Sequence, residues 1–81
     1  MTEMLKFKKL KETEKMVTYE YYPEGGTDSG VVSVEKTSGE CNVDVLATND
    51  KHRRYALKLF SRLRTFSKDG IFEKEGKIAW Y

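Results

Sequence analysis

The hydrophobic pattern of this chain changes its period near Thr48, and that change limits the folds open to it. Before Thr48 apolar and polar residues alternate, which is typical of half-buried β-strands. After it apolar residues recur every three to four positions, as on one side of a helix. A chain of 81 residues has room for one sheet and one helix around a single core. We therefore expect residues 1–81 to form one α+β domain.

Four alternating segments precede the change of period. They cover residues 4–10, 15–22, 31–36 and 41–47. In the second segment Val17, Tyr19 and Tyr21 share one face, and Thr18, Glu20 and Tyr22 share the other. The stretch PEGGTDSG and the glycine of TSGE supply the residues that tight turns require. Short connections of this kind predict an antiparallel meander of four strands.

The segment after Thr48 is predicted to be a helix packed on one face of this sheet. Seven residues fall in one arc of about 140° on a helical wheel: His52, Tyr55, Ala56, Leu59, Phe60, Leu63 and Phe66. Thr48, Asn49 or Asp50 could cap the first N–H groups, and Gly70 stands where a left-handed residue ends a helix.

The final residues alternate again. Segment 76–81 therefore predicts either a fifth strand or an apolar strap. The predicted fold is a four- to five-stranded antiparallel meander sheet with one amphipathic helix on one face, in the order β-β-β-β-α-β. We expect its core to contain Cys41 and the following residues: Tyr19, Val32, Val34, Val43, Val45, Leu59, Phe60, Leu63 and Trp80.

The charge is distributed unevenly along the chain. Residues 1–50 hold six lysines against ten acidic residues, whereas residues 51–81 hold nine basic residues against three acidic ones. Between Asp50 and Asp69 the chain carries no acid, and its bases lie opposite the apolar arc of the helix. We predict a binding surface there, formed by Arg53, Arg54, Leu57, Lys58, Arg62 and Arg64.

Three interpretations of this basic helix, residues 51–68, remain open. Acidic side chains of the sheet could compensate its charge, which is the usual situation of a charged face. It could bind phosphates of nucleic acid, with Tyr22 or Tyr81 stacking on bases. It could instead bind an acidic protein. Leu57 lies among the arginines and favours a protein contact, unless segment 71–81 folds back and covers it.

The sequence predicts no catalytic, metal or cofactor site. Cys41 and His52 are the only cysteine and histidine, and Cys41 falls on the core face, where burial raises a thiol's pKa. One histidine beside Asp50 is too few ligands for a metal ion. PEGGTDSG leads into a strand and contains two acids, so it does not resemble a phosphate-binding loop. Glu20, Glu35 and Asp44 could be neighbours on the outward faces of adjacent strands, and paired carboxylates can act in acid–base catalysis, but exposed strand faces are normally charged.

The remaining observations concern location and partners. A single cysteine cannot form an internal disulfide, and the chain shows neither a secretory signal nor an apolar run long enough to cross a membrane. We therefore expect a cytoplasmic, non-enzymatic binding module that contacts a protein partner or a second copy of itself. The alternative is a nucleic-acid-binding protein that uses the basic helix.

Overall fold

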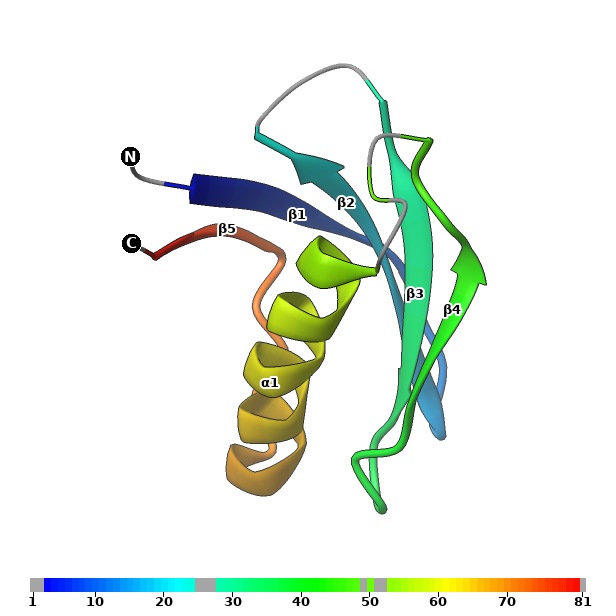
Figure 1. Cartoon of the computed structure of the whole chain (residues 1–81). Helices are drawn as coiled ribbons and strands as arrows, with labels where there is room; N and C mark the ends of the chain where they lie inside the picture. Colours follow the sequence, from blue (N-terminus) through cyan, green and yellow to red (C-terminus); the bar gives the residue numbers. More distant parts are fainter. Residues whose placement is uncertain (1–2, 25–27, 49, 51–52, 81) are drawn as a thin grey trace.

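One antiparallel sheet and one helix make up the fold (Figure 1). The computed structural model describes residues 3–24, 28–48, 50 and 53–80. Its elements are β1 (Glu3–Glu12), β2 (Met16–Pro23), β3 (Gly30–Glu35), β4 (Cys41–Val45), α1 (Arg54–Asp69) and β5 (Glu75–Trp80). The predicted α+β fold and its element order are confirmed.

The strands lie in the order β4-β3-β2-β1-β5. Strands β1 to β4 form a meander, and β5 lies at the edge beside β1. β5 pairs antiparallel with β1, with Leu5 opposite Ile78 and Lys6 opposite Lys77. Because β5 is hydrogen-bonded to β1, segment 76–81 is a sheet strand as far as the structure describes it. The alternative prediction, an apolar strap, is wrong.

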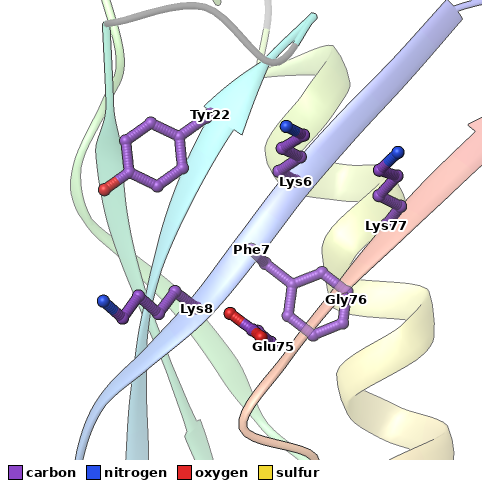
Figure 2. Close-up of a pocket in the computed structure, with 7 residues that line it drawn as sticks. All are labelled: Lys6, Phe7, Lys8, Tyr22, Glu75, Gly76 and Lys77. Carbon is purple, nitrogen blue, oxygen red and sulfur yellow. The ribbon is translucent and has the colours of Figure 1, made fainter.

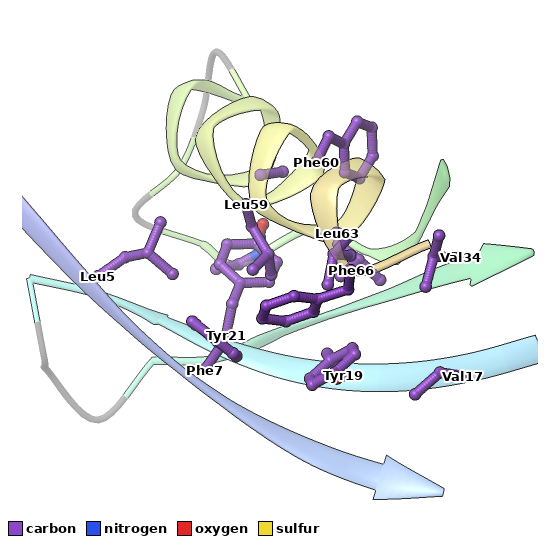
Figure 3. Close-up of a cluster of buried hydrophobic side chains, with 13 residues drawn as sticks. Leu5, Phe7, Val17, Tyr19, Tyr21, Val34, Leu59, Phe60, Leu63 and Phe66 are labelled. Atoms are coloured by element: carbon purple, nitrogen blue, oxygen red, sulfur yellow. The ribbon is translucent and has the colours of Figure 1, made fainter. Parts of the chain in front are cut away.

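The core lies between α1 and one face of the sheet (Figure 3). Alternation directs the buried strand residues toward the helix: Leu5, Phe7, Val17, Tyr19, Tyr21, Val32 and Val34. The helix contributes Ala56, Leu59, Phe60, Leu63 and Phe66. The ring of Phe66 lies 6.0 Å from that of Phe7 and 6.3 Å from that of Tyr19. We call the sheet face away from the helix the open face.

Most of the predicted core is confirmed, but the prediction for β4 is wrong in part. Val45 is 55% exposed. The pairing of β3 with β4 shifts between Val31 and Val32, so Val45 pairs with Val31, on the open face. A bulge of this kind reverses the alternation, and the side chain that should face the core faces solvent. Val43 and Cys41 are only half-buried because β4 is an edge strand.

The predicted turn and the predicted helix end lie where the sequence placed them. The stretch from Pro23 to Gly30 connects β2 to β3, although residues 25–27 lie outside the described part. Gly70 ends α1 with φ 76°, a left-handed conformation that glycine adopts without strain, and its N–H donates to the Phe66 carbonyl at 2.8 Å. His52 and the side chain of Trp80 also fall outside the described residues.

Candidate functional site

A buried carboxylate holds the start of the basic helix. Asp50 is 2% exposed, and its two oxygens accept hydrogen bonds from the backbone N–H groups of Tyr55 at 3.0 Å and Ala56 at 3.1 Å. It also accepts one from the Tyr21 hydroxyl at 3.0 Å. Arg53 then takes a left-handed conformation, with φ 59°, and α1 begins. Of the three predicted capping residues, Asp50 accepts hydrogen bonds from N–H groups of the first turn, although Arg53 occupies the N-cap position itself. The same carboxylate ties the helix to β2.

Leu57 lies on the outer face of α1 and is 55% exposed. Arg64, seven residues after Leu57, is exposed and lies on the same side of the helix. Arg53, the N-cap residue four positions before Leu57, is also exposed. The competing prediction was that segment 71–81 covers Leu57. It is wrong, because that segment leads to β5, which pairs with β1, and Leu57 stays exposed. We call Arg53, Leu57 and Arg64 the outer helix face.

The other three predicted site residues, Arg54, Lys58 and Arg62, differ in exposure and in their position around α1. Arg54 and Lys58 are exposed and continue around α1 from Leu57, and each is engaged in an interaction within the chain. Arg62 is five residues from Leu57, about 140° around the helix, and is half-buried. It lines a hollow of about 340 Å³ together with Asp69 and Glu73. The structure therefore separates Arg62 from the outer helix face.

Among the described residues, no ion pair engages the two arginines of the outer helix face. Within the described residues the ion pairs join Glu12 to Lys9 and to Lys36, each at 2.6 Å. Among those same residues no carboxylate lies within 4.0 Å of the guanidinium of Arg53 or Arg64. The interpretation that sheet carboxylates neutralise the helix therefore finds no support at these two positions.

Glu20 and Glu35, two of the three sheet carboxylates predicted to be neighbours, are not brought together, and Asp44 lines a separate hollow on the open face. Glu20 accepts hydrogen bonds from the hydroxyls of Tyr22 and Ser29, and it faces Val31 across the strand pair. Glu35 accepts a hydrogen bond from Thr37 and lies opposite Met16. Each of these two carboxylates thus interacts with its own neighbours, and the two do not form the coupled pair that general acid–base catalysis uses.

Cys41 is half-buried on the edge strand rather than in the core. Burial raises the pKa of its thiol, while the charge of Arg64 opposes that shift. The thiol donates to the carbonyl of Gly39 at 3.4 Å. Because the thiolate is the nucleophile, a raised pKa lowers the reactive population at neutral pH. The predicted partner His52 lies outside the described residues.

We predict that Cys41 reacts slowly with thiol reagents while the protein is folded. At pH 7.5 its rate with a disulfide reagent should be at least about tenfold below the rate in denaturant, because both burial and the raised pKa oppose attack. The rate in the folded protein should increase as the pH rises toward the raised pKa. Equal rates in the folded and unfolded chain would contradict this placement of the thiol.

Sequence reasoning missed a hollow on the open face, between β1, β2 and β5 (Figure 2). It has a volume of about 370 Å³ and is lined by Lys6, Phe7, Lys8, Tyr22, Glu75, Gly76 and Lys77. Alternation had directed Lys6 away from the core, which is the one signal that pointed here. The juxtaposition of Lys6 with Lys77 depends on the pairing of β1 with β5, which the local pattern does not specify.

Comparison with protein-family models, with curated proteins and with solved structures found no match to this chain. Within the described residues, no helix combines the length and apolar character that a membrane crossing requires. A search of that part of the chain for three or more clustered His, Cys, Asp or Glu side chains likewise found no metal-binding group. Two surfaces remain as candidate binding sites: the outer helix face and the hollow between β1, β2 and β5.

Proposed function

We propose that this chain is a non-enzymatic cytoplasmic binding module whose outer helix face binds an acidic protein partner. The observation that carries the proposal is Leu57, an apolar side chain 55% exposed between two exposed arginines. Burying an exposed leucine completely stabilises a complex by about 1.5–3 kcal/mol. Arginines around an apolar centre are typical of protein interfaces.

The charges of this face favour an acidic partner over a second copy of the chain. A two-fold dimer places the same surface on both sides of the contact. The guanidinium groups of Arg53 and Arg64 would then face cations of the same kind, and exposed Lys68, three turns beyond Leu57, would add to the repulsion. Carboxylates of a partner instead form charge-assisted, bidentate hydrogen bonds with arginine.

The proposal predicts that Leu57→Ser weakens association without harming the fold. The free energy of unfolding should change by less than about 0.5 kcal/mol, because the side chain is largely solvated. Affinity for the partner should fall about tenfold or more, since loss of about 1.4 kcal/mol corresponds to a factor of ten. Leu10→Ser is the matched control, because Leu10 is 50% exposed on β1.

The measurement has two stages. The wild-type, Leu57→Ser and Leu10→Ser proteins are each immobilised and used to capture binding partners. A candidate partner is a protein that the wild type and Leu10→Ser retain but Leu57→Ser does not. The candidate is then purified and its affinity measured by calorimetry, with Arg53→Glu and Arg64→Glu as further variants. Equal affinity of the wild-type and Leu57→Ser proteins would overturn the proposal. So would a large fall in melting temperature of Leu57→Ser, or a wild-type dimer in sedimentation that this substitution dissociates.

A further inference from the structure

Two lysines of the open face stand directly opposite each other. Register places Lys6 of β1 between Tyr22 of β2 and Lys77 of β5, so these three side chains form one row across the sheet. Like charges at directly opposed positions destabilise an antiparallel pair. Within the described part of the chain, neither lysine has a carboxylate within 4.0 Å of its ammonium group.

The neighbouring row places a lysine opposite two acids, although no carboxylate of the described residues lies within 4.0 Å of its ammonium group. Lys8 lies between Glu20 and Glu75, so its charge is flanked by two carboxylates at opposed positions. The Lys6–Lys77 pair departs from this arrangement. Electrostatic repulsion that the fold leaves uncompensated often marks a functional position. An anion bound between the two ammonium groups would relieve this repulsion.

The hollow around this pair also offers an aromatic surface. In Figure 2 the side chains of Lys6 and Lys77 extend in the same direction, and the ring of Tyr22 presents its face on the other side of Lys6. Tyr22 is half-buried, and its hydroxyl donates to Glu20, which holds the ring in place. Planar bases stack on aromatic rings held in this way.

Lysines also line a second hollow of the open face, farther along β1 beyond the row of Lys8. This one has a volume of about 570 Å³ and is lined by Lys11, Thr13, Lys15, Met16, Thr18, Ser33, Asn42 and Asp44. Consecutive outward lysines at positions 6 and 8 are separated by about 6.6 Å along the strand. Both hollows border β1, so one extended polyanion could contact Lys6, Lys77 and Lys11 together.

We propose that the open face binds single-stranded nucleic acid along β1, with phosphates at Lys6, Lys77 and Lys11 and a base stacked on Tyr22. The chain of linked phosphates suits the spaced lysines, and the unpaired bases suit the exposed ring. Glu20, Glu75 and Asp44 face the same surface and will limit the affinity, so binding should be weak and strongly dependent on salt. The function is independent of the outer helix face.

Fluorescence anisotropy with labelled single-stranded 12-mers of DNA and RNA at low salt tests this proposal. Lys6→Ala with Lys77→Ala should weaken binding about tenfold, since two phosphate contacts are lost. Tyr22→Ala should weaken it about fivefold or more, because a stacked base is lost. Tyr22→Phe keeps the ring and should bind like the wild type. Arg53→Ala with Arg64→Ala removes the same charge from the outer helix face and should leave the affinity almost unchanged.

Four outcomes would overturn the proposal: no binding of either strand at low salt, equal or tighter binding of a duplex, binding of free adenosine monophosphate as tight as that of the 12-mer, or a larger loss from the helix variant than from the sheet variants. Melting temperatures of all variants establish that they are folded. The Leu57→Ser measurement is unaffected by any of these results, so failure of the sheet site and failure of the helix site are distinguishable.

Discussion

Truncation of Leu63 to alanine should lower the free energy of unfolding by about 2–5 kcal/mol. Leu63 is fully buried between α1 and the sheet, where it belongs to the continuous apolar cluster (Figure 3). Removing its branched end loses the transfer free energy of the deleted groups and leaves a cavity that the surrounding side chains fill only in part. Urea unfolding followed by circular dichroism measures the change.

The control for this substitution lies on the same helix. Ser61 is exposed two residues earlier, so Ser61→Ala should change the free energy of unfolding by less than about 0.5 kcal/mol. A domain of this length has a total stability of about 4–12 kcal/mol, so Leu63→Ala removes a large share of it. A change of only a few tenths in Leu63→Ala would mean that the helix does not pack on the sheet through this side chain.

Replacement of Asp50 by alanine should be comparably damaging, with a loss of about 2–5 kcal/mol. Three donors lose their acceptor at once: the Tyr21 hydroxyl and the N–H groups of Tyr55 and Ala56. The carboxylate is 2% exposed, so water does not readily replace it. The first turn of α1 contains no acid that could take over the cap.

Asp50→Asn separates the geometry of this cap from its charge. The amide retains one acceptor oxygen, so its loss of stability should be smaller than that of Asp50→Ala. Burial raises the pKa of Tyr21 to about 12, which keeps its hydroxyl a donor throughout the neutral range. Thermal melts of the two variants measure the difference. Equal stability of Asp50→Ala and the wild type would contradict the central role of this carboxylate.

Local patterns were sufficient for the elements and for most of the core. Alternation in β2 and β3 depends only on residues two positions apart, so it correctly placed Tyr19, Val32 and Val34 on the buried face. Helical periodicity likewise placed Leu59 and Leu63 inside and Leu57 outside. Gly70 ends the helix through its own backbone conformation. Each of these features depends on neighbours within about one helical turn.

Contacts between distant segments decided the rest. The sequence indicated alternation in β4, but the bulge that turns Val45 outward exists only in the pairing with β3. It indicated a basic helix, but the packing of that helix decided that Arg62 is half-buried beside Asp69 and Glu73 while Leu57 stays exposed. Lys6 and Lys77 belong to strands at opposite ends of the chain, and their opposition follows from the pairing of β1 with β5. Alternation determines which face a strand residue occupies, whereas register between strands determines its neighbours, and register is set by tertiary packing.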